Sequence, residues 1–561
     1  MKKILIGLAW PYVNGDLHIG HLAGYLFPAD IFARFHRFLG NDVLMVSGSD
    51  CYGTPITIEA DRRGLHPKDI IDEYHAKNVS LFKELGISFD LYTKTTTETH
   101  KNITQEIFLA LLNKGYVIKK TTPQYYSPAE KKFLPDRYVE GICPHCDYEG
   151  TRSDQCENCG RVLEQGELIN PKSKENGKKV ELRDTEHYFI DWQKFEPFLK
   201  SYLEKRKGRW REWVWNEAFG WLKEGLKPRA ITRDLDWGIE LPLKDISEDK
   251  RIRHIEEKRI YVWFEAVIGY LSASIEWSHN QTKKGKKVSW EDFWCNERAE
   301  HSYFMGKDNL AFHALFWPGE LYGYDEHIHL PDNLFINQFL TLEGQKFSKS
   351  RNIIIDSKYI TETYGNDPVR FYLTSISPEK RDANFSWAEF VNKHNDVLIG
   401  NLGNFINRTL TLARDATFQE KLVEKKIQNH VEKKLEEAKE AMLHGEGKKY
   451  LETLLALSDE GNKYLSKHEP WKQKDSATHI FHKTMTNCAM ILLGVQTLLK
   501  PLLPETCQKM EKMTGITLSL WPQKGELKRA LQKINIEESR PLFRKIEKEV
   551  IEFERGKLLV Q

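Results

Sequence analysis

The N-terminal part of the chain alternates between apolar runs and polar turns in a way that predicts a strand, a helix and a second strand. Residues 3–10 (KILIGLAW) form an apolar run typical of a buried strand, and a Pro-Asn-Gly-Asp turn region follows. Apolar side chains then recur at helical spacing at Leu22, Leu26, Phe32, Phe35 and Phe38. Gly40 is a typical helix stop, and residues 42–50 (DVLMVSGSD) predict a buried strand with a polar tip.

This order of elements is the opening unit of a doubly wound domain. We therefore expect an α/β fold with a Rossmann-type doubly wound parallel sheet. Ligands of such sheets bind at the carboxyl ends of the strands. His18, His21 and Asp50 all fall at that predicted edge.

Further shifts in pattern divide the rest of the chain. From about residue 116 the composition turns polar and cysteine-bearing, residues 259–277 return to apolar character, and from about residue 387 only helical periodicity remains. These shifts predict an α/β domain in two halves (1–115 and 232–325), an insert (116–231), a connecting region (326–386), an α-helical domain (387–535) and a C-terminal helix packed on the body (536–561).

Length and composition restrict the class of protein. With 561 residues the chain is too long for one core, so about three or four domains are expected. Charged residues make up 29% of the chain, and no apolar stretch approaches the roughly 20 residues that span a bilayer. The N-terminal apolar run is short and lacks a cleavage-like site, so we expect a cytoplasmic protein without membrane contact.

A net charge of +2 does not decide for or against a polyanionic partner, so only local charge clusters are informative. One such cluster, the insert cluster at residues 204–215 (EKRKGRWREWVW), interleaves basic side chains with tryptophans. A helix with a solvated basic face and a buried aromatic face is favoured over an RNA-binding surface.

Half of the cysteines are concentrated in one segment. Of eight in the chain, four lie in CPHCDYEGTRSDQCENCG at Cys143, Cys146, Cys156 and Cys159. Two pairs with two residues inside each pair are typical of four thiolates around one tetrahedral Zn²⁺, a closed site with no position left for catalysis. Disulfides or idle thiols are the weaker alternative in a cytoplasmic chain. We predict one structural zinc that folds a knuckle at 143–159 within the insert.

A polar motif near the middle of the chain, LEGQKFSKSRN, contains Lys346 and Lys349. Alone it is typical of any exposed turn. Combined with His18 and His21 at a helix N-terminus, it suits a triphosphate that is attacked at its α-phosphorus while pyrophosphate leaves. The helix dipole and imidazoles would hold phosphate oxygens, and the lysines would follow the charge of the leaving group. Gly20 leaves room for an adenine ring against the backbone.

The two motifs, HIGH at residues 18–21 and KFSKS at residues 346–350, resemble the nucleotide-binding motifs of the class I aminoacyl-tRNA synthetases. Most relatives have Met where this chain has Phe347, and we expect little effect from that change. The resemblance implies ATP with Mg²⁺ and the following ATP-site residues: His18, Gly20, His21, Asp308, Lys346, Ser348 and Lys349. Catalysis would rest on positioning and charge stabilisation, with no nucleophilic side chain.

Four further segments are similar to the methionyl-tRNA synthetase family: AWPY, SDCYGTP, YVWFEAVIGY and MGKDNLAFHALFWP. They imply the following methionine-site residues: Ala9, Trp10, Tyr12, Asp50, Trp263, Ala266, Tyr270 and His313. Asp50 holds the position that meets the substrate ammonium, whereas Trp10 and Tyr52 depart from the Leu and His common in relatives. Aromatic side chains suit a polarizable thioether. Core packing is the alternative for each of them and is equally favoured for Phe312.

The size of the insert separates this family from its neighbours. Relatives specific for Leu, Ile and Val carry a large editing domain, because one methylene discriminates by only about 1–3 kcal/mol, and residues 116–231 leave no room for one. Relatives specific for cysteine use zinc as a substrate ligand, which four filled positions prevent. The alternatives are another class I synthetase, a non-catalytic tRNA-binding relative, and a small-molecule nucleotidyltransferase, which would have no use for the helical domain.

The helical part supplies the expected RNA contacts. The resemblance identifies 326–386 as the stem-contact region and 387–535 as the anticodon-binding domain, with Pro470 and Trp471 at the anticodon-binding Pro-Trp pair. An exposed Trp stacks on an unpaired base for about 1–3 kcal/mol, and burial between helices is the alternative. Asn401 aligns with an Arg frequent in relatives. The implied partners are methionine tRNA, L-methionine and ATP. A monomer is expected, because the chain shows no sign of the β-barrel by which some relatives dimerise.

Overall fold

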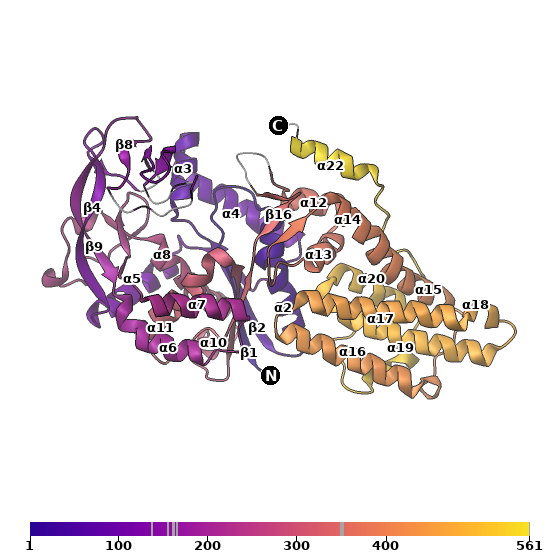
Figure 1. Cartoon of the computed structure of the whole chain (residues 1–561). Coiled ribbons are helices and arrows are strands. Elements are labelled where there is room, and N and C mark those ends of the chain that lie inside the picture. Colours follow the sequence, from indigo (N-terminus) through magenta and orange to yellow (C-terminus); the bar gives the residue numbers. More distant parts are fainter. Residues whose placement is uncertain are drawn as a thin grey trace.

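The computed structural model describes residues 1–135, 138–153, 156, 158–159, 163, 166–347 and 353–559. Strands gather in one half of the molecule and long helices in the other (Figure 1). The last helix, α22 (Glu549–Leu559), returns from the helical half toward the middle, above α12 and α14 (Figure 1). Among the described residues, no helix has the length and apolarity needed to cross a bilayer.

A five-stranded sheet forms the centre of the strand-rich half. Its order is β15 (Asn333–Asn337), β14 (Glu300–Gly306), β1 (Lys3–Leu8), β2 (Asp42–Ser49) and β3 (Leu91–Lys94). All neighbours pair in parallel. The chain winds outward from β1 in both directions, so the switch point of the sheet lies between β1 and β14. The predicted doubly wound α/β fold is confirmed.

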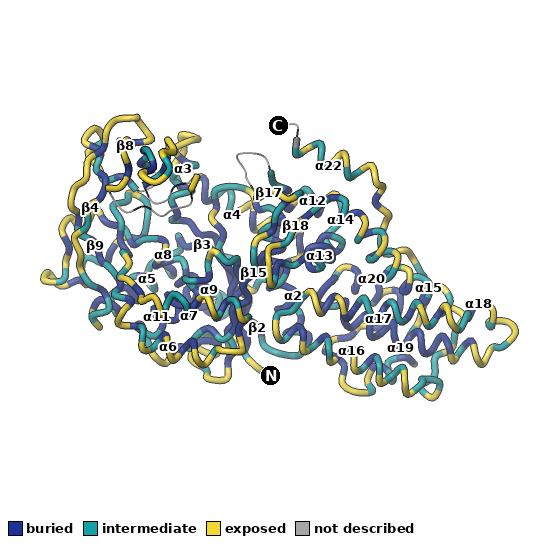
Figure 2. Tube along the Cα trace, in the orientation of Figure 1, coloured by how far each residue is buried: buried dark blue, intermediate teal, exposed yellow. Residues whose placement is uncertain are grey.

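The alternation of side chains along β1 explains why both faces of the sheet are covered. Ile4 and Ile6 belong to one hydrophobic core and Leu5 to another, because successive side chains of a strand point to opposite faces. The first core includes α2 (Phe27–Phe38) and continues into the helical half. Figure 2 shows buried residues running through both halves of the molecule. The two halves are therefore joined by a shared core.

Further helices cover the sheet or connect its strands. Their bounds are α3 (Thr54–Arg63), α4 (Pro67–Glu84), α5 (Glu98–Asn113), α8 (Val262–Glu265), α9 (Gly269–Lys283), α10 (Glu291–Trp294) and α11 (Trp317–Tyr324). A short antiparallel sheet joins β11 (Thr232–Asp234), β13 (Lys258–Ile260) and β12 (Ile239–Glu240).

The insert between α5 and β11 has its own sheets. One contains β10 (Arg229–Ala230), β9 (Glu181–Ile190), β4 (Val117–Ser127) and β5 (Lys132–Phe133), and the other β7 (Glu149–Arg152), β6 (Val139–Ile142) and β8 (Ile169–Ser173). The predicted single helix across the insert cluster is wrong, because α6 (Glu196–Glu204) ends at the first residue of the cluster and α7 (Glu212–Glu224) begins within it. Gly208 between them has φ +79°, a left-handed conformation that ends a helix.

After β15 the chain forms a small sheet and then helices only. The sheet contains β17 (Gln345–Lys346), β16 (Leu340–Leu342) and β18 (Ala383–Phe385), with α12 (Ser357–Tyr364) and α13 (Asn366–Ser375) beside it. The helices that follow are α14 (Trp387–Asn392), the π-helix η9 (Lys393–Gly403), α15 (Asn404–Ala413), α16 (Lys425–Leu443), α17 (Gly447–His468), α18 (Pro470–Gln473), α19 (Thr478–Leu502), α20 (Pro504–Thr514) and α21 (Glu526–Ala530). The predicted helical C-terminal part is confirmed.

Candidate active site

The carboxyl ends of β1 and β2 bring the AWPY and SDCYGTP segments together. The backbone N–H of Ala9 donates to Phe304 O (2.9 Å), which extends β1 along β14. The N–H of Asp50 donates to Pro11 O (3.0 Å), and Tyr12 and Asp50 form an isolated parallel bridge. Segments forty residues apart in the sequence thus lie side by side next to the switch point between β1 and β14, where ligands of doubly wound sheets bind.

The HIGH motif builds its own helix start. His18 caps α1 (Ile19–His21): its Nδ1 accepts from Gly20 N (3.1 Å), and His21 Nδ1 accepts from His18 N (3.1 Å). The two imidazoles lie 4.1 Å apart between ring centres. A π-helical turn, η1 (Leu22–Leu26), follows directly, and such turns occur often at functional sites. Both rings are therefore held by the backbone of a helix N-terminus, the end that attracts anions.

Backbone pairing brings the segment after the KFSKS motif against HIGH. The N–H of Ile19 donates to Ile355 O (3.1 Å), and the N–H of Ser357 donates to Leu17 O (3.0 Å). His18 and Asp356 form an antiparallel bridge between the same segments. The segment that follows the KFSKS motif is thereby anchored beside the HIGH turn, although more than 300 residues separate the two in the sequence.

The start of the KFSKS motif reaches HIGH itself. Lys346 is exposed at the end of β17, and the ring of Phe347 stacks on His18 with 4.7 Å between ring centres and 12° between planes. Ser348 and Lys349 lie outside the described residues. Phe347 therefore contacts the first histidine of the other motif, a role that the comparison with Met-containing relatives did not suggest.

An aromatic cluster lies behind the switch point, with Tyr270 at its centre. Its hydroxyl donates to His313 Nε2 (2.8 Å), while His313 Nδ1 donates to Asn309 O (2.9 Å). Burial lowers the pKa of His313 to about 4, so the imidazole is neutral and can accept the Tyr270 hydroxyl. Trp10 meets Tyr270 edge-on at 6.4 Å.

Trp10 fits this cluster only because glycines flank its ring. A Cβ at Gly48 would lie 2.1 Å from Trp10 Cζ3, and one at Gly269 would lie 2.7 Å from Trp10 Cε2. Trp263, next to Ala266, is 48% exposed and packs edge-on against Phe312 at 5.6 Å. The structure thus gathers a buried aromatic wall and an exposed aromatic rim from the segments singled out in the sequence.

Asp50 is buried at the end of β2. Its pKa is raised well above the usual range, first by burial and then by the charge of Glu265, while a backbone hydrogen bond from Tyr52 (3.4 Å) acts in the opposite direction. A carboxyl in this setting favours a cationic partner, because ion pairing offsets the loss of hydration.

Sequence reasoning missed a buried pair beside Asp50. His100 Nε2 lies 2.7 Å from Glu265 Oε2, and His100 Nδ1 lies 2.8 Å from Ser272 Oγ. Burial raises the pKa of Glu265 and lowers that of His100 to about 3. The only sequence signal for the pair was a carboxylate within the apolar run YVWFEAVIGY.

Asp308, which was predicted at the ATP site, is exposed just beyond the carboxyl end of β14.

The cysteine quartet of the insert forms a compact cluster. All four Sγ atoms lie within 4.8 Å of one another, with Cys143 and Cys159 3.9 Å apart and Cys146 and Cys156 3.7 Å apart. A tetrahedron with Zn–S bonds of about 2.3 Å has S–S edges of about 3.8 Å. The N–H of Cys159 donates to Cys156 Sγ and lowers the pKa of that thiol to about 6, which favours the thiolate that binds metals. The donor set can hold a metal ion.

The far end of the helical half presents Trp471. Pro470 begins α18, and Trp471 behind it is 43% exposed. The guanidinium of Arg408 lies 5.4 Å from the Trp471 ring, a neighbour that sequence reasoning missed. Asn401 makes hydrogen bonds within the helical domain. Its Nδ2 donates to Leu455 O (3.1 Å), and its backbone carbonyl accepts from Asn462 Nδ2 (2.9 Å).

Comparison with known proteins agrees with this arrangement. Residues 4–410 match the family model described as tRNA synthetases class I (M), and residues 416–556 match the anticodon binding domain of methionyl tRNA ligase. The chain is 41% identical to the methionine–tRNA ligase of Thermomicrobium roseum, covering 100% of this chain and 99% of that protein. Identity to the ligase of Dehalococcoides mccartyi strain CBDB1 is also 41%, covering 99% of each chain. The methionyl-tRNA synthetase of Mycobacterium tuberculosis, solved in complex with methionyl-adenylate, superposes with a TM-score of 0.75 at 22% identity, covering 97% of this chain and 100% of that one.

Proposed function

This chain belongs to the methionine–tRNA ligase family of class I aminoacyl-tRNA synthetases, and from that membership we propose how its residues activate methionine and charge tRNA. The methionine carboxylate attacks the α-phosphorus of ATP in line, which forms methionyl-adenylate and releases pyrophosphate. The hydroxyl of the terminal tRNA adenosine then attacks the methionyl carbonyl and releases AMP. Positioning and charge stabilisation carry both steps.

The triphosphate is held between HIGH and the KFSKS loop. His18, His21 and the amides of the α1 N-terminus bind phosphate oxygens, Gly20 admits the adenine, and Asp308 faces the nucleotide from the turn just beyond β14. Lys346 follows the charge on the departing pyrophosphate, a role shared by Ser348 and Lys349 from the loop. Mg²⁺ that accompanies ATP neutralises part of this charge. The observation that carries the proposal is the backbone pairing of Ile19 with Ile355, because it anchors the loop beside the helix that binds phosphate.

Methionine lies against the aromatic cluster. Asp50 pairs with its ammonium, and Trp10, Tyr270 and His313 surround the thioether with polarizable faces and a hydroxyl. Trp263 and Tyr12, both partly exposed, close the pocket from the solvent side, with Ala9 and Ala266 as the small neighbours that leave space for the substrate.

ATP–pyrophosphate exchange with each amino acid in turn tests the proposed activation. Exchange with methionine alone is the expected result. Exchange with a different amino acid would overturn the pocket assignment while keeping the class of reaction. No exchange from folded, metal-loaded protein would overturn the activation itself.

The cysteine quartet holds one structural Zn²⁺. Cys143, Cys146, Cys156 and Cys159 fill all four positions, so the ion supplies folding stability to the knuckle and takes no part in the reaction.

Cys146→Ser should empty this site. We expect bound zinc to fall from one per chain to near none, because removing a ligand exceeds the roughly 10- to 100-fold loss of affinity caused by removing a residue that only orients a ligand. The insert should then become sensitive to proteolysis. Zinc is measured by atomic absorption, and Cys295→Ser, at an exposed cysteine outside the cluster, is the control. Full zinc content in Cys146→Ser would contradict the assignment.

The anticodon loop meets Trp471. Its exposed ring offers a stacking platform for an unpaired base, and Arg408 adds positive charge at the ring face. Pro470 sets the start of α18 and Asn401 supports the helix behind it.

Trp471→Ala should lower kcat/KM for charging of methionine tRNA by roughly 5- to 150-fold, because loss of one stacked base costs about 1–3 kcal/mol. Pyrophosphate exchange should stay unchanged, since the catalytic centre lies in the other half of the molecule. Leu520→Ala, at a 59%-exposed residue, is the control. Normal charging by Trp471→Ala would remove this residue from the RNA site.

The acceptor end of the tRNA reaches the centre through a groove between the insert and α3–α4. This groove of about 1040 Å³ is lined by Tyr52, Trp237, Arg183 and Arg259 among others. Trp237 Nε1 donates to Cys51 O (2.8 Å), so the groove begins beside Asp50. Its aromatic side chains offer stacking faces for unpaired bases, and because its carboxylates outnumber its basic side chains, stacking rather than phosphate contact supports this part of the proposal.

We propose a division into a catalytic domain (1–115 and 232–325, its sheet completed by β15), a connective insert (116–231), a stem-contact region (326–386), an anticodon-binding domain (387–535) and a C-terminal segment (536–561). The protein works as a cytoplasmic monomer.

A further inference from the structure

Three arginines of the insert cluster, Arg206, Arg209 and Arg211, donate hydrogen bonds to the catalytic sheet and the segment before it. Arg206 donates from Nε (3.2 Å) and Nη2 (3.0 Å) to Pro331 O, and Arg209 Nε donates to Asn333 Oδ1 (2.8 Å). The prediction of a solvated basic face is therefore wrong for Arg206 and Arg211, because the turn at Gly208 redirects the chain along β15, whereas Arg209 stays exposed.

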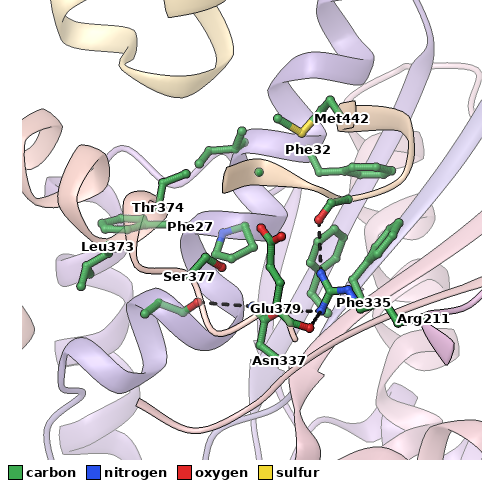
Figure 3. Close-up of a pocket in the computed structure, with 16 residues that line it drawn as sticks. Phe27, Phe32, Arg211, Phe335, Asn337, Leu373, Thr374, Ser377, Glu379 and Met442 are labelled. Carbon is green, nitrogen blue, oxygen red and sulfur yellow. Dashed lines mark hydrogen bonds between the residues drawn. The ribbon is translucent and has the colours of Figure 1, made fainter. Parts of the chain in front are cut away.

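Arg211 is the deepest of them and joins separate parts of the molecule. Its Nη1 donates to Ile336 O (2.6 Å) and Asn337 Oδ1 (2.9 Å) at the end of β15, and to Glu379 O (2.9 Å) after α13. Its Nη2 donates to Gly445 O (3.3 Å) in the turn between α16 and α17. Figure 3 shows Arg211 beside Asn337 and Glu379. One side chain of the insert thus binds the catalytic sheet, the stem-contact region and the anticodon-binding domain.

The turn that Arg211 holds fits closely against β15. Gly445 has φ +65°, and a Cβ there would lie 2.4 Å from the ring of Phe335. A second bond secures the same turn, since Lys448 N donates to Glu379 Oε1 (3.0 Å). The turn of the anticodon-binding domain therefore packs closely against Phe335 of β15.

The other side of the joint reaches the HIGH helix. Asn337, whose Oδ1 accepts from Arg211, donates from Nδ2 to Gly24 O (2.8 Å) in the π-helical turn that follows HIGH. Gly445 and the turn behind His21 are thus connected through two side chains. These two side chains thus connect the anticodon-binding domain to the ATP end of the catalytic centre.

The cavity at this joint is too small for a substrate. It is lined by Phe27, Phe32, Phe335, Leu373 and Met442 together with Arg211 (Figure 3). Its volume of about 20 Å³ accommodates roughly one water molecule. The joint is therefore a mechanical contact between domains.

We propose that Arg211 is a positioning residue that fixes the distance between the anticodon-binding site and the catalytic centre. The inference rests on the proposed function, because it requires one tRNA to occupy both sites. Two linked contacts reinforce each other only when the geometry permits simultaneous engagement, and the advantage is lost when the spacing is wrong. Without Arg211 the helical domain shifts on Phe335, and a bound tRNA no longer delivers its acceptor end to the adenylate.

The test compares Arg211→Gln with the wild-type protein in three assays: pyrophosphate exchange with methionine, binding of an anticodon stem–loop RNA, and charging of full-length methionine tRNA. We expect exchange and stem–loop affinity to stay within about twofold, while kcat/KM for charging falls roughly 10- to 100-fold as linkage between the sites is lost. Arg211→Lys, which keeps the charge and some donors, should recover part of the charging activity. Arg206→Gln is the matched control, since Arg206 binds only Pro331 O among these groups.

Gly445→Ala tests the other side of the joint. Its Cβ meets Phe335, whereas Gly447→Ala places a Cβ in ordinary contact 3.7 Å from Glu379 Oε1, so only the first should reproduce the Arg211→Gln pattern. Unchanged charging in Arg211→Gln and Gly445→Ala would overturn the proposal. So would losses of exchange or stem–loop binding equal to the loss of charging. A wild-type protein that fails in exchange would overturn the proposed function instead.

Discussion

Asp50→Asn is expected to remove most methionine activation and, at the same time, to raise the thermal stability of the protein. The carboxyl lies buried beside Glu265, and in the proposed function it pairs with the substrate ammonium. Removing one partner of a buried charge pair costs about 2–5 kcal/mol, so kcat/KM for methionine in pyrophosphate exchange should fall roughly 30- to 5000-fold.

The rise in stability follows from the direction of the pKa shift. Burial first, and then Glu265, raise the folded-state pKa of Asp50 above its unfolded value, so ionisation opposes folding wherever the unfolded chain is ionised. Asn removes this opposition, and Tm should rise at neutral pH. The gain should fade as the pH falls through the unfolded pKa of about 4. The wild-type KM for methionine should rise toward acid pH, because a protonated carboxyl cannot pair with an ammonium.

Asp42→Asn is the control for both effects. Asp42 begins the same strand at the opposite edge of the sheet and pairs with Lys3 Nζ (2.8 Å), with its side chain 41% exposed. Its replacement should leave exchange unchanged and shift stability by no more than about 0.5 kcal/mol. If Asp50→Asn activates methionine normally, the ammonium binds elsewhere; a lower Tm in this variant would show that Asp50 stabilises the fold.

The second large effect concerns His18. His18→Ala should lower the rate of adenylate formation by roughly 10²- to 10³-fold, the loss typical of removing one preorganised donor from a developing charge. KM for methionine should change little, since in the proposed function the imidazole contacts the phosphates and not the amino acid.

The structure adds a complication, because His18 also caps α1 through Gly20 N (3.1 Å) and stacks on Phe347. Loss of a cap alone costs about 0.5–2 kcal/mol of stability. His18→Asn separates the roles, since Asn caps helices well but has no imidazole. We expect Asn to restore Tm and leave adenylate formation slow. Recovery of the rate by Asn would assign His18 a capping role only.

The features that could be predicted before the fold was known are local. The apolar periodicity predicted the strand–helix–strand start and the helical C-terminal part, and the family motifs identified the reaction, because these signals lie within short segments whose chemistry does not depend on distant residues. The spacing of the cysteines predicted a cluster that the fold brings within reach of one metal ion. The capping bonds of HIGH belong to the same class, since they join residues within one turn.

Contacts between side chains that are distant in the sequence could be identified only from the folded chain. In the sequence, Glu265 is one polar residue in an apolar run. In the structure, His100 Nε2 lies 2.7 Å from Glu265 Oε2. From the sequence, the replacement of Met by Phe347 is expected to have little effect. In the structure, the ring of Phe347 stacks on His18. Arg211 belongs to a cluster that was predicted to be solvent-exposed from its composition. Its guanidinium instead donates to backbone carbonyls of three other parts of the chain. A carbonyl is the same acceptor in every residue, so its partners leave no mark on the sequence and depend on how the chain folds.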